Sequence, residues 1–231
     1  MSTKRTMSAP PRKPRWFRQA TVWIPTWRAW LSALVLGALT LVLVLREAHG
    51  FLSVHHPVPA NVLVVEGWLN DGSLRAAVRE FERGGYEWII AAGGPMPKGH
   101  LVSGYASYAA IAEDTLAKLG VPAERRLQAP AEKVYRHRTH VSAVGVRARI
   151  EELGQPVRGI NVVSEGPHAR RTWATYRKVF GAGTPVGVIA VEPIEYDPRR
   201  WWAYSDGVKG TLTEGLGWLY EWLFDSGRGG D

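Results

Sequence analysis

The sequence predicts an α/β fold in which one domain, residues 61–224, follows a single membrane-spanning helix and precedes a flexible C-terminus at 225–231. Three observations predict it. Short apolar segments alternate with amphipathic segments from residue 61 onward, the apolar segments are rich in Val and Ile, and an uncharged run of 17 residues precedes them. Strand–helix alternation is typical of a mostly parallel sheet with helices on both faces. A chain of 231 residues, 45% of them hydrophobic, is long enough for one such core and an additional apolar segment.

The predicted membrane helix covers residues 29–46. Its main part, AWLSALVLGALTLVLVL, carries no charge and is near the minimum length for an α-helix across a hydrocarbon core of ~30 Å. Trp23, Trp27 and Trp30 lie at its N-terminal edge, where indole rings favour the headgroup layer. A buried core helix would show polar residues at helical spacing, which this run lacks. A cleaved signal peptide is the other alternative, but Ala48-His49-Gly50 is a poor cleavage site and favours an uncleaved anchor.

Residues 1–28 form a basic tail with seven of the 29 Lys and Arg residues and no Asp or Glu. The positive-inside rule therefore predicts a cytoplasmic tail, one helix through the cytoplasmic (inner) membrane, and an extracytoplasmic, periplasmic C-terminal domain. Removing the tail from the net charge of +8 leaves 22 basic and 21 acidic side chains, so the domain is nearly neutral. We expect the membrane as a partner and no nucleic acid.

The absence of certain residues and motifs makes several kinds of site and enzyme activity less plausible for this sequence. It contains no Cys, which excludes disulfides, thiolate metal sites and cysteine nucleophiles. It also lacks G-x-G-x-x-G, the Walker loop, G-x-S-x-G and H-E-x-x-H, so dinucleotide, ATP, serine-hydrolase and zinc-protease interpretations are disfavoured. The sequence therefore does not identify a cofactor.

The first half of the domain predicts two strands and the helix between them. Residues 47–60 contain prolines and adjacent histidines and are predicted to be a linker. The run NVLVV at 61–65 is β-branched without alternation, as expected for a parallel strand buried on both faces. A helix with apolar spacings of four and three then ends at Gly84-Gly85. The strand WIIAA follows at 88–92 and is ended by Gly93-Gly94-Pro95.

The middle of the domain continues the alternation. Residues 105–119 have apolar side chains on one helical face and end at Gly120. Residues 126–130 form a weak strand, and residues 139–153 form a helix for which Thr139 is the expected N-cap.

The last part adds two strands and a helical tail. Residues 159–164 and 186–191 are apolar strands, and residues 169–180 form the helix between them. The complete alternation predicts a Rossmann-like, doubly wound sheet. From Pro198 the tail is predicted to be a helix in two pieces, and its end, LGWLYEWLF, either packs on the domain or contacts the membrane surface.

Marked residues follow three of the predicted strands, at the edge where open α/β sheets bind ligands. They are Glu66-Gly67-Trp68, Gly93-Gly94-Pro95 and Ser164-Glu165-Gly166-Pro167-His168. Glycines let backbone approach a ligand, and the start of the next helix attracts anions. Arg170 and Arg171 in a first helical turn oppose the helix dipole, which a bound anion would explain. The alternative is that Glu165 simply pairs with Arg170.

A second polar segment, EKVYRHRTH, precedes the helix at 139–153. His137 and His140 are three residues apart, but no further ligands accompany them, so we expect no metal site. A loop that brings Arg136, Arg138 and Thr139 to the same cleft is the preferred interpretation.

The order of these motifs resembles the YdcF-like family, the envelope group that includes SanA and ElyC. The family's Ser-x-x-His-x-x-Arg segment matches Ser164, His168 and Arg171, with one additional residue between Ser164 and His168. Glu66-Gly67-Trp68 stands where many relatives carry a glycine-rich turn. The other matching segments are IIAAGGP (89–95), LAKLGVP (116–122), RTHVSA (138–143) and WWAYSDGVKGTLTE (201–214).

The resemblance implies a Rossmann-like domain behind one membrane helix. It also implies a link to envelope integrity, to peptidoglycan or polysaccharide metabolism and to lipid-carrier supply. A cytoplasmic relative has been associated with S-adenosylmethionine binding. The family has no established common reaction, so enzymatic activity stays open.

We therefore expect an envelope protein whose domain binds an anionic ligand, a phosphorylated glycan or lipid-carrier intermediate, as a hydrolase or transferase. Glu66 or Glu165 would be the general acid or base, and His168 would exchange the proton. Two alternatives remain: a non-catalytic docking module for envelope-assembly enzymes, and a binder of S-adenosylmethionine or a nucleotide. The expected ligand-binding residues are Gly67, Gly93, Gly94, Arg138, Thr139, Ser164, Arg170, Arg171 and Ser205.

Ser205 and Glu214 lie in the tail segment at 201–214. They either close the cleft or serve as a helix cap and a surface acid.

Overall fold

A computed structural model describes residues 22–97 and 99–224. The chain divides into two compact units, Met1–Leu43 and Val44–Asp231. Most of the predicted basic tail, residues 1–21, and the predicted flexible C-terminus, residues 225–231, lie outside the described residues.

The first helix, α1 (Trp27–Leu52), has 26 residues and is long and apolar enough to cross a membrane. It continues beyond the predicted span into the predicted linker at 47–60. His49 and Leu52 in its last turn are buried, and His56 pairs with Val188 in an isolated antiparallel bridge. Much of the predicted linker is thus packed structure, because its side chains contact the domain.

Five strands form one sheet in which every strand pair is parallel, and their order is β3-β2-β1-β4-β5. This confirms the predicted α/β, Rossmann-like class, with β1 at the centre. The strands are β1 (Val62–Glu66), β2 (Trp88–Gly93), β3 (Arg126–Pro130), β4 (Ile160–Glu165) and β5 (Val186–Val191).

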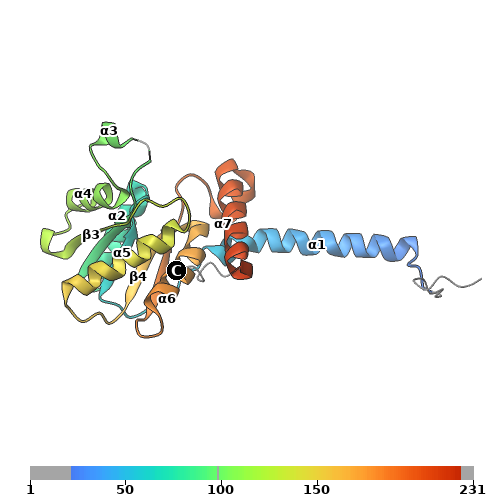
Figure 1. The fold of residues 1–231 in the computed structure, drawn as a ribbon. Coiled ribbons are helices and arrows are strands. Elements are labelled where there is room, and N and C mark those ends of the chain that lie inside the picture. The colour runs from blue at the N-terminus through green and yellow to red at the C-terminus, as the bar shows by residue number, and fades with distance from the viewer. Residues whose placement is uncertain (1–21, 98, 225–231) are drawn as a thin grey trace, which may run out of the picture. The chain divides into compact units, whose positions relative to one another are not determined.

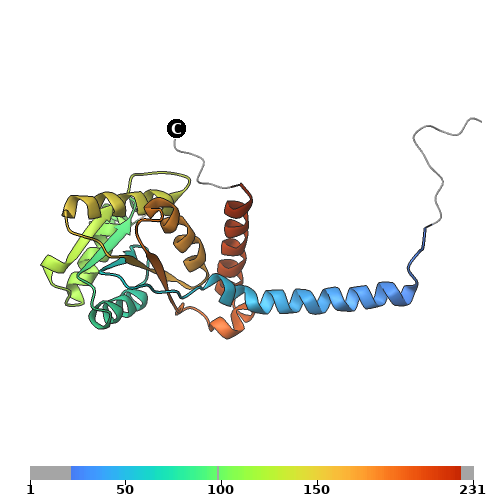
Figure 2. The same cartoon turned by 90° about the horizontal axis from the view of Figure 1, so that it is seen from below.

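Helices cover both faces of the sheet (Figure 1, Figure 2). Side chains alternate between the faces along each strand. One core cluster joins Leu63 and Val65 to α2 (Asp71–Arg83) and α4 (Tyr108–Lys118). The second cluster joins Val62 and Val64 of the other face to α5 (Arg138–Leu153) and α6 (Ala169–Phe180).

Several element boundaries differ from the prediction. β1 and β4 each extend one residue further than expected, so Glu66 and Glu165 are the last residues of strands. α5 begins at Arg138, after His137 in the left-handed conformation (φ 55°), and its N-cap position has no side-chain hydrogen bond. Thr139 is therefore inside the helix, and its prediction as N-cap is wrong.

Three short elements complete the described chain before the tail, and one of them is the 3₁₀-helix η1 (Ala123–Arg125), which leads into β3. Helix α3 (His100–Ser103) has only four residues and was not predicted. The 3₁₀-helix η2 (Gly166–His168) leads from β4 into α6, and Gly166 takes the positive φ of 46° that this turn requires.

The tail is helical in two pieces, as predicted. They are the 3₁₀-helix η3 (Pro198–Ala203) and α7 (Ser205–Phe224). Gly207 allows the first turn of α7 to pack closely on η3, since a Cβ at this position would lie 2.3 Å from the carbonyl oxygen of Trp201. α7 contacts η2 and α6, so it lies at the carboxyl edge of the sheet.

Asn161 of β4 binds the segment that follows α1 through hydrogen bonds to the backbone of Val58. Its side chain is almost fully buried in β4. Its Oδ1 accepts from the Val58 N–H at 2.9 Å, and its Nδ2 donates to the Val58 carbonyl at 2.8 Å and to the Tyr86 hydroxyl at 2.9 Å.

We expect Asn161→Ala to lower the free energy of unfolding by roughly 2–4 kcal/mol, because it removes three hydrogen bonds, of which the one to the Tyr86 hydroxyl is buried. Urea unfolding of the full chain in detergent micelles measures this. Gln155→Ala, at an exposed position, is the control and should change stability by less than about 0.5 kcal/mol. Equal stability of the two variants would contradict the role of Asn161.

Candidate functional site

The candidate site is a cluster of charged side chains at the carboxyl edge of the sheet. It begins with Glu66, which ends the central strand β1 and is only 6% exposed. The hydroxyl of Ser164, from β4, donates to Glu66 Oε2, and the hydroxyl of Thr172, from α6, donates to Oε1 at 3.2 Å. The carboxylate is thus held in place by two neutral donors from neighbouring elements.

His168 joins Glu66 to a second carboxylate. Its Nε2 lies 3.3 Å from Glu66 Oε1, and its Nδ1 lies 3.1 Å from Glu214 Oε1 of α7. Both ring nitrogens therefore face acceptors, which only the doubly protonated imidazolium can satisfy. Burial alone would lower the pKa of His168, but the two carboxylates outweigh it and raise the pKa to about 9.

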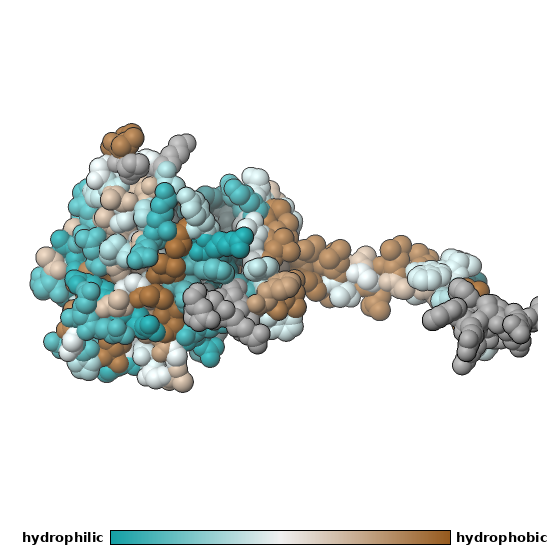
Figure 3. All heavy atoms as spheres, in the orientation of Figure 1, coloured by the Kyte–Doolittle hydropathy of each residue, from teal (hydrophilic) through white to brown (hydrophobic). Residues whose placement is uncertain are grey.

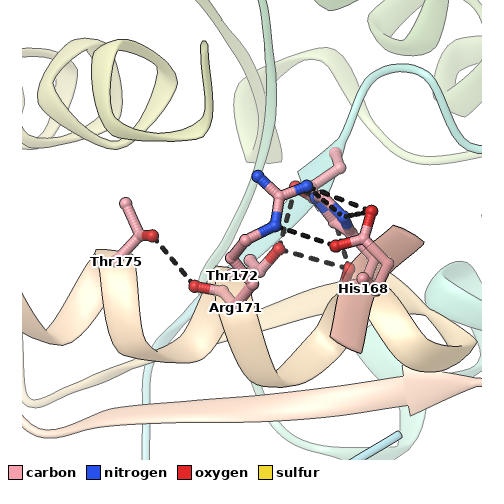
Figure 4. A network of polar contacts seen from close by, with 7 residues as sticks. His168, Arg171, Thr172 and Thr175 are labelled. Carbon is pink, nitrogen blue, oxygen red and sulfur yellow. Dashed lines mark hydrogen bonds and ion pairs between the residues drawn. The ribbon is translucent and has the colours of Figure 1, made fainter. Parts of the chain in front are cut away.

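Arg171 also pairs with the carboxylate of Glu214, and Figure 4 shows Arg171 beside His168. Its Nε donates to Oε2 at 2.8 Å and its Nη2 donates to Oε1 at 3.1 Å, in the paired geometry that suits a guanidinium. Arg171 Nη2 is also 3.1 Å from His168 Nδ1; both are donors, and they share Oε1 as acceptor. Burial would raise the pKa of Glu214, yet hydrogen bonds from His168 and Arg171 lower it to about 2.

The charges of this cluster balance. Burial would raise the pKa of Glu66, but the positive charge of His168 and three hydrogen bonds lower it, so Glu66 is ionised. Two carboxylates thus face two cations. We call Glu66, His168, Arg171 and Glu214 the charged cluster.

Local geometry explains why these residues meet. β1 and β4 are adjacent and in register, with Val65 opposite Val163, which puts Glu66 and Ser164 side by side on one face. His168, Arg171 and Thr172 are spaced by three and four residues, so they share one side of the helical turn that follows β4 (Figure 4). The predicted Ser164, His168 and Arg171 segment is therefore brought together with Glu66.

Glu165 does not join them. It follows Ser164 in the strand and therefore points to the opposite face of the sheet. There it accepts from Asn70 Nδ2 at 2.8 Å and from Ser73 Oγ at 2.7 Å, so the alternative in which it pairs with Arg170 is wrong. Burial raises the pKa of Glu165, and the hydrogen bond from Ser73 opposes that rise. Glu66 and Glu165 share an edge of the sheet but lie on different faces.

The glycines at the strand ends serve packing. A Cβ on Gly67 would lie 2.4 Å from the carbonyl oxygen of Tyr108, and one on Gly93 would lie 2.8 Å from the Tyr108 Cβ. Both glycines thus admit the first turn of α4, where the sequence interpretation placed a ligand. Gly94 is half-buried, and its carbonyl accepts from the Tyr108 N–H at 2.9 Å.

The remaining predicted ligand residues lie outside the charged cluster. The side chain of Arg170 donates to the Phe51 carbonyl and stacks over the Phe51 ring at 3.8 Å. Arg138 and Thr139 start α5 next to the edge strand β3, which is two strands, ~10 Å, from β1. Ser205 is exposed at the start of α7. Ser164 has no exposed surface, so it positions Glu66 and does not face solvent.

Sequence reasoning did not include Glu214, Thr172 and Trp68 among the site residues. Glu214 was recognised only as a candidate for closing the cleft, and its place opposite the apolar stripe of α7 is typical of a solvent-facing acid. Trp68 contacts His168 edge-to-face, with ring centroids 5.2 Å apart. Trp68 also lines a hollow of about 170 Å³ with Met96 and Tyr108, beside α2 and α4, which the residues of the charged cluster do not line.

Within residues 22–97 and 99–224, no group of three or more His, Asp or Glu side chains has a metal-binding arrangement. No protein-family model matches the chain, and no curated protein matches it. The site is therefore interpreted from its chemistry, which consists of one anchored imidazolium, one guanidinium and two carboxylates.

We expect the free energy of unfolding to fall by roughly 3 kcal/mol between pH 6.5 and 9, because the raised pKa of His168 stabilises the fold below the unfolded value and this contribution is lost as pH rises to about 9. Urea unfolding of the full chain in detergent at several pH values measures it. His55→Gln, at an exposed histidine, should keep the slope, and His168→Gln should remove it. A flat wild-type profile would show that His168 is not held as an imidazolium.

Proposed function

We propose that this protein is a membrane-anchored envelope protein whose domain binds an anionic ligand at the charged cluster. One observation carries the proposal: Arg171 and His168 converge on a single carboxylate, that of Glu214, at the carboxyl edge of the sheet. The site therefore already holds an anionic group, supplied by the chain itself. A ligand phosphate would take the same donors in exchange for Glu214.

The donor set suits a phosphate. A guanidinium offers two parallel N–H groups, and phosphate oxygens accept them as carboxylate oxygens do. The exposed ring of Trp68 contacts His168 edge-to-face and offers an aromatic surface for a sugar or prenyl group attached to that phosphate. These features support the expected phosphorylated glycan or lipid-carrier ligand.

Exchange of Glu214 would also make His168 reactive. With both carboxylates in place, neither ring nitrogen is free. Departure of Glu214 would free Nδ1–H to donate to the ligand, so that the imidazolium could pass this proton to an oxygen that leaves the phosphate. Glu66 would still hold Nε2. In this proposal His168 is the general acid of a hydrolase or transferase, and Glu66 orients it.

The membrane context supports the envelope assignment. α1 could span a bilayer, and the basic flank at residues 1–28 favours a cytoplasmic N-terminus under the positive-inside rule. The similarity of the Ser164–Arg171 segment to the YdcF-like family points to the same location.

We expect inorganic phosphate and a short polyprenyl phosphate to bind the full chain in nanodiscs, measured by calorimetry and by thermal unfolding. Arg171→Ala should abolish binding because it removes the paired donor. Glu214→Gln should tighten binding about tenfold, ~1.4 kcal/mol, because it removes the competing carboxylate. A ligand at a hundredfold its Kd should add ~2.7 kcal/mol to stability.

Arg170→Ala is the matched control, since it removes a cation one residue away that contacts Phe51 and not Glu214. Binding that survives Arg171→Ala, or that is lost equally in Arg170→Ala, would refute this site. Unchanged circular dichroism of each variant shows that the fold persists.

Topology can be tested independently because the chain has no native cysteine. We expect a membrane-impermeant maleimide to label Gln155→Cys in intact bacterial spheroplasts and to label Ser8→Cys only after lysis. The positive-inside rule places these two positions on opposite sides of the bilayer. The reverse pattern would put the domain in the cytoplasm.

The balance of charge in the cluster favours one alternative, a non-catalytic docking module. Every cation of the charged cluster is already paired, so the cluster can serve solely to hold α7 on the domain. In that case neither wild-type protein nor Glu214→Gln binds phosphate, and both Arg171→Ala and Glu214→Gln lower stability. Calorimetry on Glu214→Gln thus separates the two functions.

A further inference from the structure

Helix α7 carries a stripe of exposed leucines. Leu212, Leu216, Leu219 and Leu223 are spaced by four, three and four residues, so they share one face of the helix. Their exposed fractions are 46%, 70%, 41% and 57%. We call them the leucine face. In Figure 3 apolar side chains gather over α7, whereas much of the domain surface beside it is hydrophilic. An exposed apolar face of this length marks a contact with another apolar phase.

The opposite side of α7 is the one packed on the domain. Gly207 and Thr211 are buried there, and Glu214 binds His168 and Arg171. Glu221, seven residues after Glu214, lies on the same side and is half-buried. Small and polar residues thus face inward and leucines outward, the reverse of a surface helix in a water-soluble domain. The leucine face itself has no acidic residue.

α7 packs on the last turn of α1. Trp218 contacts Phe51 edge-to-face with ring centroids 5.1 Å apart, and Gly215 lies against Leu52. Phe51 is six residues after Leu45, the last residue of the uncharged run, which corresponds to ~9 Å along a helix axis. The headgroup layer is ~5–8 Å thick on each side of the hydrocarbon core. A distance of ~9 Å is close to that thickness, so the contact between Trp218 and Phe51 keeps α7 near the end of the uncharged run.

Aromatic and basic side chains flank the leucine face. Tyr220 and Trp222 of α7 and Trp202 of η3 are exposed, and such rings favour the membrane–water interface. Arg46 lies 5.7 Å from the centre of the Trp202 ring, and Lys209 is exposed in the first half of α7. We expect these cations to interact with lipid phosphates.

We propose that the leucine face of α7 is a second membrane contact, which lies in the headgroup–acyl boundary of the bilayer that anchors the chain. The occupant is the lipid surface itself, because α7 packs on the last turn of the helix that carries the anchor and its exposed side carries the interfacial residue types. The inference rests on the membrane anchor of the proposed function. In this arrangement the outer side of α7 contacts lipid, and its inner side contributes Glu214 to the charged cluster.

Single cysteines test this in the otherwise cysteine-free full chain in nanodiscs. Leu216→Cys and Leu223→Cys are labelled with a fluorophore, and quenchers at known lipid depths are compared with an aqueous quencher. We expect both labels to lie ~5–10 Å below the headgroup level. Gln155→Cys is the water-exposed control, and Leu36→Cys, inside the uncharged run, should report the bilayer centre at ~15 Å. Both leucine positions are exposed, so the thermal midpoint should not change.

The controls separate failure of this inference from failure of the anchor. Lipid quenching at position 36 with purely aqueous quenching at position 216 overturns the second contact and leaves the anchor intact. Aqueous quenching at position 36 overturns the anchor itself and the inference with it. A disulfide-linked dimer through position 216 shows that a second copy covers the leucine face, which also overturns the lipid assignment.

Discussion

The ion pairs that His168 makes with Glu66 and Glu214 are the contacts on which the rest of the site depends. Glu66 ends the central strand, and Glu214 belongs to a helix at the far end of the chain. An imidazolium between them compensates two carboxylates that would otherwise be costly to bury. Both ring nitrogens of His168 must be protonated to make these two contacts. The protonation state of this one histidine therefore affects the attachment of α7 to the sheet. Removing either carboxylate would change the pKa of His168 and the attachment of that helix together.

This coupling decides what chemistry the site can perform. In the described conformation Arg171 and His168 have their acceptors, and Ser164 is enclosed. Neither a base nor a nucleophile is free. Anion binding and proton transfer both require Glu214 to leave its donors, whereas a docking role does not. The position of Glu214 is therefore the physical difference between the two proposed functions.

α7 is held on the domain by the ion pairs of Glu214 and by the packing of Gly215 and Trp218 on the last turn of α1. Helices of soluble domains are usually held by their apolar side, and here that side faces outward. If the leucine face rests on lipid, the bilayer and the charged cluster act on opposite faces of one helix. A shift of α7 at the membrane would then move Glu214 relative to His168 and Arg171, which links the lipid surface to access to the anion site.

The sequence by itself determined the fold class, all five strands and the candidate membrane helix, because burial on two sheet faces and length in hydrocarbon both leave local patterns of apolar residues. It also placed Glu66, His168 and Arg171 at one edge of the sheet. Only the tertiary structure decided that Glu165 points to the other face, that Gly67 and Gly93 admit α4, and that Glu214 completes the cluster. The register between β1 and β4 decides which of their last side chains share a face, and the contact between residues 168 and 214 depends on packing between distant segments, which no local pattern records.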